Sequence, residues 1–154
     1  MYLVEKNLRI LANRNKANAP AGKLVITDPE DMRQPFRRDL EELVKQSESV
    51  SPLVALATFS TQVRRSQSAE GQIESTETSI YYMPFMSVDS LIDSYEWYND
   101  VIRDVAAKAG VLLIGDEHRI PGDSVHFTDK GGAVMAARVT AALLTSPRFR
   151  ELAE

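Results

Sequence analysis

The spacing of apolar residues along the chain predicts alternating helices and strands. Residues 4–12 carry apolar side chains at helical spacing, and the breakers at residues 19–22 end this first helix. Residues 23–27 are expected to be short and extended. A second helix is predicted after Asp28, with Pro29 in its first turn, and Pro35 leaves open a start one turn later. Its inner face is predicted to hold Met32, Phe36, Leu40, Leu43 and Val44.

The rest of the pattern predicts two strands and two further helices. Residues 53–59 form a nearly unbroken apolar run, which is typical of a strand buried on both faces of a parallel sheet. Residues 60–79 are polar without a clear period and predict a long mobile loop. A helix then runs from Ser87 or Asp89 to Ala109, with Gly110 after its end. Its inner face is expected to hold Leu91, Tyr95, Tyr98, Ile102, Val105 and Ala109.

Residues 111–114 predict the second strand, and Thr128 is expected to cap a last helix with Met135, Val139 and Leu143 inside. Strand, helix, strand, helix is an α/β order, which implies a parallel sheet with right-handed crossovers. The length of 154 residues, 44% of them hydrophobic and 26% charged, fits a single domain over residues 1–154.

Composition narrows the classes of partner. The formal net charge is −4 and the basic residues are scattered, so no continuous stripe suits a nucleic acid backbone. The chain has no cysteine, which excludes disulfides and cysteine nucleophiles and leaves the cellular compartment open. Charge appears at Glu5 and Lys6, so we expect neither a signal peptide nor a membrane segment in this chain.

The segment from Gly122 to Gly131 carries the candidate chemistry. Asp123 stands three residues before His126, so on one turn its carboxylate can accept a hydrogen bond from the imidazole Nδ1–H. That bond would fix the tautomer and stabilise the imidazolium, while Nε2 faces a substrate as general base. The segment follows the last predicted strand, and open α/β sheets bind ligands at the carboxyl ends of their strands. His126 and Asp123 are therefore the candidate catalytic residues.

This segment resembles the last motif block of SGNH/GDSL-type hydrolases, which reads D-x-x-H, an apolar residue, Thr, two residues and Gly. The resemblance extends in order over about residues 32–144, and the block around His126 is its specific motif. It implies a flavodoxin-like three-layer α/β/α sandwich and hydrolysis of carboxylic esters, often acetyl or lipid esters, by Ser-His-Asp chemistry without a cofactor. We expect Phe59, Val125 and Phe85 to line the substrate, which can be a small-molecule, carbohydrate or lipid ester.

The family's earlier blocks are not found in order. The sequence Gly122-Asp123-Ser124 spells the nucleophile block but belongs to the last block, and Glu117 stands where a serine is needed after Gly115-Asp116. If residues 23–27 were the strand before the family's third block, Glu30 would stand at an oxyanion donor, and a carboxylate cannot donate a hydrogen bond. We therefore prefer the register in which Met1 follows all three early blocks and the first helix is an excursion after the third. We therefore expect this chain to supply the base and its orienting acid, to lack the serine and the first strands of the fold, and to be inactive when isolated.

Two other kinds of site remain open. The cluster of acids and imidazoles at residues 116–118, 123 and 126 has ligand types that suit zinc or manganese, but it lacks a known metal spacing such as H-E-x-x-H, so no metal is expected. Alternatively, a degenerate esterase could be a binding module that captures a partner strand at an exposed sheet edge. The same edge predicts self-association.

Three features of the middle of the chain have more than one interpretation. The aromatic and methionine cluster at residues 81–86 belongs either to the core or to a substrate wall. Trp97 is expected on the outer side of its helix, where it marks a contact surface. Arg64 and Arg65 are either solvated or meet an acidic substrate.

Overall fold

A computed structural model describes residues 4–8, 11, 29–83, 85–115 and 126–154 of the chain. Its elements are α2 (Pro29–Val50), β1 (Ala55–Ala57), α3 (Ala69–Tyr82), α4 (Val88–Ala109), β2 (Leu112–Ile114), α5 (Asp129–Thr145) and α6 (Pro147–Ala153). Residues 4–8 and 11 are helical, in agreement with the predicted first helix. The extended segment predicted at residues 23–27 lies outside the described residues.

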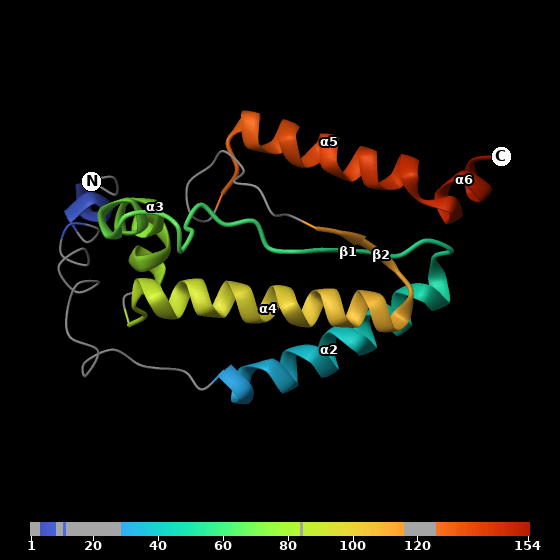
Figure 1. Cartoon of the computed structure of the whole chain (residues 1–154), viewed down its shortest axis with the longest axis horizontal. Coiled ribbons are helices and arrows are strands. Elements are labelled where there is room, and N and C mark those ends of the chain that lie inside the picture. Colours follow the sequence, from blue (N-terminus) through green and yellow to red (C-terminus); the bar gives the residue numbers. More distant parts are fainter. Residues whose placement is uncertain (1–3, 9–10, 12–28, 84, 116–125) are drawn as a thin grey trace.

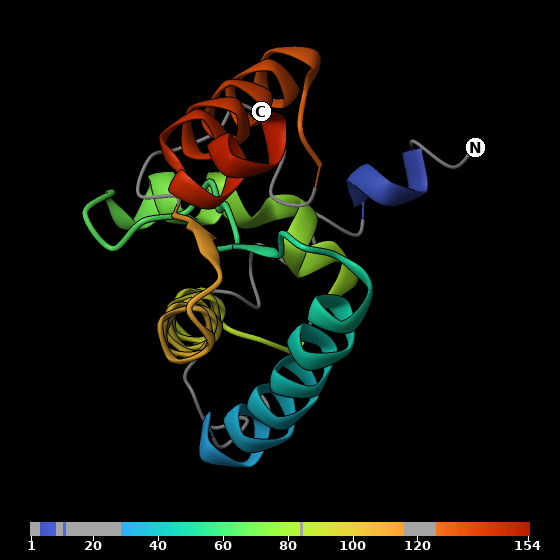
Figure 2. The same ribbon diagram turned by 90° about the vertical axis from the view of Figure 1, so that its right-hand side faces the viewer.

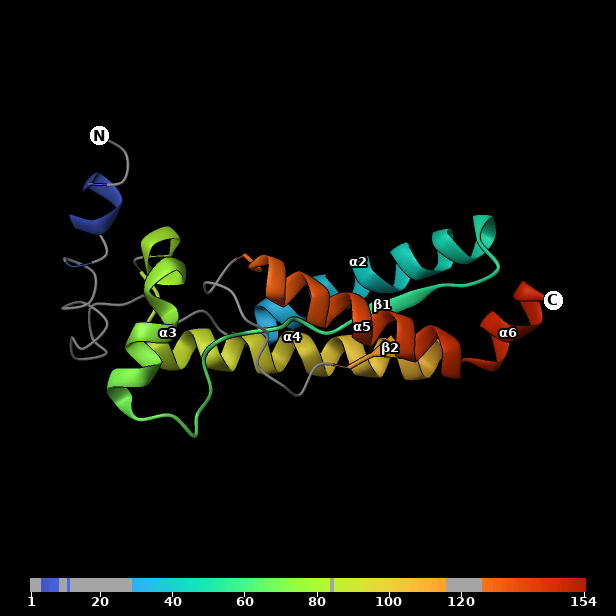
Figure 3. The same ribbon diagram turned by 90° about the horizontal axis from the view of Figure 1, so that it is seen from above.

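The elements form layers around a small sheet (Figure 1). Strands β1 and β2 pair in parallel, with Ala55 opposite Leu112 and Ala57 opposite Ile114. Helices α2 and α4 pack against each other on one face, and α5 packs against β2 on the other face (Figures 1 and 2). The view from above shows α4 and α5 lying along the direction of the strands (Figure 3). The predicted α/β class is therefore confirmed.

Helix α2 begins at Pro29 and contains Pro35 in its interior, so the later start considered from the sequence is wrong. Pro35 cannot donate to the carbonyl of Asp31, but both residues are exposed and water can bond that carbonyl. Val44 is buried, whereas the predicted inner residues Met32 and Leu43 are 46% and 57% exposed. Val44 packs with Val101 and Val105 of α4, and this cluster forms one part of the core.

Helix α4 confirms its predicted limits because both of its ends are encoded locally. Ser87 accepts a hydrogen bond from the backbone N–H of Ser90, and Gly110 has a left-handed φ of 70°. Leu91, Ile102 and Val105 are buried as predicted, Tyr95 and Tyr98 are half-buried, and Ala109 is exposed.

Helix α3 is a correction to the predicted loop over residues 60–79. The chain is irregular only as far as Ser68, whose side chain caps the helix at the N–H of Gly71. The buried residues of α3 are Thr76, Thr78, Ser79 and Ile80, which are 1%, 8%, 1% and 2% exposed. Three of these four residues are polar, so no apolar period marks the helix. The Thr76 hydroxyl is satisfied within the helix because it donates to the carbonyl of Gln72 at 2.8 Å.

Strand β1 is also a correction, because it is not buried on both faces. Leu56 is half-buried against the cluster of α2 and α4, and Thr58 is buried, but Ala55 and Ala57 on the alternate face are exposed. Side chains alternate along a strand, so this face of β1 is open, while α5 packs against the neighbouring strand β2. The second strand, predicted at residues 111–114, is observed at Leu112–Ile114.

The last two helices follow each other through Ser146. Thr128 caps α5 as predicted, and Ser146 caps α6, with Pro147 at its first position. The predicted inner residues Met135, Val139 and Leu143 are half-buried. Helix α6 was not predicted as a separate element. Only one residue separates the end of α5 at Thr145 from the start of α6 at Pro147, so no loop marks the boundary in the sequence.

Candidate functional site at the carboxyl edge of the sheet

The parallel pairing of β1 and β2 brings the ends of both strands to one edge of the sheet. Thr58, Phe59 and Ser60 follow β1 at this edge, and Gly115 follows β2. The described chain resumes at His126, just before α5, whose first turn lies over the same end of the sheet in Figure 1. Asp123 and Val125 fall outside the described residues, so the predicted contact between Asp123 and His126 has no structural test.

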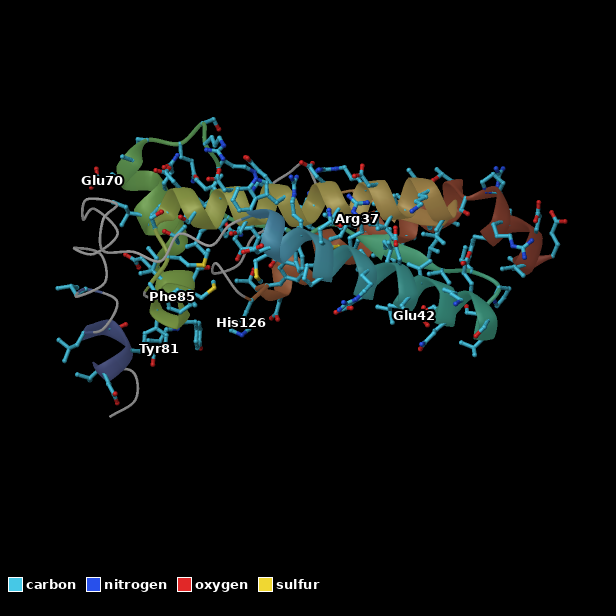
Figure 4. All side chains as sticks on the ribbon, turned by 90° about the horizontal axis from the view of Figure 1, so that it is seen from below. Arg37, Glu42, Glu70, Tyr81, Phe85 and His126 are labelled. Atoms are coloured by element: carbon cyan, nitrogen blue, oxygen red, sulfur yellow. The ribbon has the colours of Figure 1, made fainter. Side chains whose placement is uncertain are left out.

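His126 is exposed and stands two residues before the cap of α5 (Figure 4). The hydroxyl of Thr128 accepts a hydrogen bond from the N–H of Gly131 at 3.2 Å, and the N–H of Gly132 donates to the Thr128 carbonyl at 2.8 Å. These bonds fix the backbone that leads out of His126 into the helix. A rigid helix start therefore follows the candidate base.

Asn99 holds the backbone at the end of β1 and was not singled out from the sequence. Its Oδ1 accepts from the N–H of Phe59 at 2.6 Å, and its Nδ2 donates to the Phe59 carbonyl at 3.1 Å. Asn99 is 7% exposed and Phe59 is 46% exposed, so both bonds are part-buried. The sequence did contain a signal that Asn99 is buried. This asparagine lies four residues after Tyr95 and three before Ile102, and so it occupies a core position of α4.

Phe59, predicted to line the substrate, is 46% exposed beside two tyrosines of α4. Its ring centroid lies 6.4 Å from that of Tyr95 and 6.2 Å from that of Tyr98. Phe59 lines a cavity of about 150 Å³ together with Asn99 and Tyr95, and His126 does not line it. The hydroxyl oxygen of the next residue, Ser60, is buried without a hydrogen-bond partner. Like Asn99, Ser60 lies at this edge and was not singled out from the sequence.

Phe85, also predicted to line the substrate, lies in a different cavity. That cavity has a volume of about 280 Å³ and is walled by α2, α4 and the turn before α4. Tyr95 lines both cavities, whereas Phe59 lines only the first and Phe85 only the second. The structure therefore does not bring Phe59 and Phe85 into one pocket.

Arg65 is tied to α4 and is not simply solvated. Its guanidinium pairs with Asp93 and, at 2.9 Å, with Glu96. The hydrogen bonds to Glu96 and Asp93 raise the pKa of Arg65 above its already high ordinary value, so it stays charged at every accessible pH. This exposed network anchors the irregular segment after β1 to the helix below it.

The metal interpretation depends almost entirely on residues that are not described. Asp116, Glu117, His118 and Asp123 lie outside the described ranges, and only His126 of the cluster is placed. Over the residues that are placed, the structure contains no group of three or more His, Cys, Asp or Glu side chains arranged to hold a metal ion.

A larger cavity lies at the opposite edge of the sheet and is separate from the candidate chemistry. It has a volume of about 720 Å³ and lies between the amino ends of both strands and the junction of α5 with α6. Parallel α/β sheets bind ligands at their carboxyl edge, so cavity size does not identify the site here.

Comparisons with known proteins add no relative. No protein-family model, no curated protein and no solved structure matches this chain. Within the described ranges, no helix is both long and apolar enough to cross a membrane.

Proposed function

We propose that this chain is part of an ester hydrolase of the SGNH/GDSL type, with His126 as general base and Asp123 as its orienting acid. The proposed fold is a flavodoxin-like sandwich of which β1 and β2 are two neighbouring strands. The substrate class is a carboxylic ester, and no cofactor is required by this chemistry.

The position of His126 carries the proposal. The residue follows the last strand of a parallel sheet and directly precedes a helix that Thr128 caps. His126 and Thr128, the described residues of the D-x-x-H-x-T block, thus lie after β2 and at the start of α5, and this position supports the proposal. Its exposure leaves the imidazole accessible to a substrate.

The proposed reaction needs a serine hydroxyl in addition to His126 and Asp123. The Nε2 atom of His126 would take the proton of a serine hydroxyl, and Asp123 would hold Nδ1–H and stabilise the resulting imidazolium. The sequence places no serine in a recognisable nucleophile block. Without a nucleophile and oxyanion donors, the chain alone is expected to leave esters essentially unhydrolysed.

Histidine NMR tests the base directly, because the chain has only two histidines. With ¹⁵N-labelled histidine, the proposal expects the neutral imidazole of His126 to carry its proton on Nδ1. Asp123→Asn should shift the tautomer equilibrium towards Nε2–H, as in a free imidazole side chain, while His118 serves as the internal control. A His126 tautomer that is the same in both proteins would contradict the assigned roles.

Labelling with a fluorophosphonate tests the missing serine separately. We expect no adduct on the purified chain. An adduct that disappears in His126→Ala would retain the hydrolase proposal but show that the nucleophile is present, and peptide mapping would then decide between Ser60 and Ser124. An adduct that persists in His126→Ala would be non-specific.

A second candidate function is a binding module that uses the open side of β1. In the part of the chain that the structure describes, the sheet has the order β1-β2, so the outer edge of β1 has no partner strand. The N–H of Thr58 and the carbonyl of Val54 bond to β2, so by alternation the backbone groups of Ala55 and Ala57 point to that outer edge. Such an edge can pair with a strand of a second copy.

Light scattering distinguishes this function. If β1 pairs with a second copy, the chain should form a dimer as its concentration rises. Ala57→Lys should weaken this dimer, because a lysine on an edge strand opposes pairing. Ala136→Lys is the matched control, since it adds the same charge to an exposed alanine of α5. A monomer at every concentration, or equal effects of the two substitutions, would exclude pairing through this edge.

A further inference from the structure

The cavity between α2 and α4 has the form of a binding site for a small ligand. Its volume is about 280 Å³, and its apolar walls include Met32, Phe85, Met86, Leu91 and Trp97. Methionine and aromatic side chains make adaptable apolar surfaces. Ligand sites are concave, mostly apolar and provided with a few polar groups, and this cavity adds one charged residue, Arg33, to such a lining.

Arg33 is the feature that selects a ligand. Its side chain is 32% exposed and its single ion pair in the described chain is a loose one, 3.7 Å from Nη2 to Asp100. The Nε–H of Arg33 is buried without a hydrogen-bond partner. A guanidinium has five N–H donors, and leaving a partly buried charge without hydrogen bonds is unfavourable.

The neighbouring charges do not neutralise Arg33. Asp100 also accepts a hydrogen bond from Arg103 at 3.1 Å, so two guanidinium groups share a single carboxylate. This trio carries a net charge of +1 at neutral pH, next to an apolar cavity. The side chain of Arg33 is 32% exposed, so an anion in the cavity can add acceptors for the accessible N–H groups of its guanidinium.

We propose that this cavity binds a small amphipathic carboxylate, with the apolar body between α2 and α4 and the carboxylate on Arg33. At liquid density the cavity would hold about nine waters. A ligand with about ten non-hydrogen atoms, such as octanoate, matches that size. A guanidinium binds a carboxylate through charge-assisted hydrogen bonds, whereas it repels an amine and gains less from an alcohol.

The proposal does not rest on the proposed hydrolase function, because His126 is not among the residues of this cavity. The turn before α4 and the start of α5 lie on opposite sides of the sheet in Figure 1. Failure of the histidine experiments would therefore leave the carboxylate site in place, and the reverse also holds.

Intrinsic fluorescence is a direct readout, because the chain has one tryptophan and Trp97 lines the cavity. We expect octanoate to change the fluorescence saturably, octanol to bind at least about tenfold more weakly, and octylamine and acetate to have no saturable effect. No saturable change with octanoate, or equal affinity for octanol and octanoate, would overturn the proposal.

Variants test the contact with the carboxylate and the contact with the apolar body separately. Arg33→Gln should weaken octanoate binding about tenfold or more and leave octanol binding unchanged, which also shows that the cavity has kept its shape. Arg38→Gln is the matched control, because Arg38 is on the same helix, pairs with Asp39 and does not line the cavity. If Arg33→Gln does not fold, Ser94→Leu, which fills the cavity from α4, must abolish octanoate binding. Equal affinities of Arg33→Gln and Arg38→Gln would refute the role of Arg33.

Discussion

Replacing Asn99 should reveal how much the end of β1 depends on one buried amide. Asn99→Ala leaves the N–H and the carbonyl of Phe59 without their partners, which lie 2.6 Å and 3.1 Å from the amide atoms. Each buried backbone group that loses its partner costs about 1–3 kcal/mol. Asn99 is 7% exposed but both bonds are only part-buried, so we expect a total loss in the lower part of the range for two such groups, about 2–4 kcal/mol in the free energy of unfolding.

Asn99→Asp separates the two hydrogen bonds. An ionised carboxylate can still accept from the N–H of Phe59 but repels the Phe59 carbonyl, whereas a protonated carboxyl can donate to it. Burial and the carbonyl both raise the pKa of the introduced group above its unfolded value of about 3.9. Since the folded pKa is the higher one, the stability of this variant relative to the native chain is greatest at low pH. It should fall as the pH rises through the folded pKa.

Urea denaturation followed by circular dichroism measures both effects. With an m value of about 1–3 kcal/mol per M, a loss of about 3 kcal/mol moves the midpoint by about 1–3 M. Asn7→Ala is the control, because Asn7 is exposed and should change stability by less than about 0.5 kcal/mol. If Asn99→Ala costs no more than Asn7→Ala, the amide does not hold the strand end and our explanation of the site geometry is wrong.

Three further predictions concern packing, helix ends and charge. Val44→Ala should lower the free energy of unfolding by about 2 kcal/mol, whereas Leu43→Ala should lower it by less than about 0.5 kcal/mol because Leu43 is 57% exposed. Equal losses in urea denaturation would contradict the orientation of α2. Gly110→Ala should cost about 1 kcal/mol from its φ of 70° alone, since an added Cβ meets nothing within 4 Å; a neutral result would mean that the turn is not left-handed. Arg65→Met should increase proteolysis of the segment after β1 and make that proteolysis independent of salt, whereas unchanged cleavage would show that the pairs with Asp93 and Glu96 do not anchor it.

The sequence predicted those elements whose signals are local. Ser87 and Gly110 encode both ends of α4, and Thr128 encodes the start of α5. Helix α3 was missed because its buried face uses threonine and serine, which carry no apolar period. The exposure of one face of β1 was also missed, because an apolar run does not indicate that the helix on that side of the sheet packs against the neighbouring strand.

The site was predictable only where a motif exists. The block around His126 led to the carboxyl edge of the sheet, which the parallel pairing then provided. Asn99 and Arg33 act through contacts with residues far along the chain, and nothing near them in sequence indicates those contacts. Asn99 lies 40 positions from Phe59, so only the packed structure relates the two residues.

The parallel pairing of β1 with β2 also determines the order in which the chain can assemble. A ribosome releases β1 before α3, α4 and β2 exist, so for a time its apolar residues have no strand to join. Helices form in about a microsecond, whereas distant segments must first close a long loop. Ala55 pairs with Leu112 across 57 positions and Arg37 with Asp104 across 67, so the sheet and the contact between α2 and α4 both depend on closing a long loop and should both form late. During that interval the nascent chain is most exposed to aggregation, and a chaperone that shields short apolar segments would act on β1.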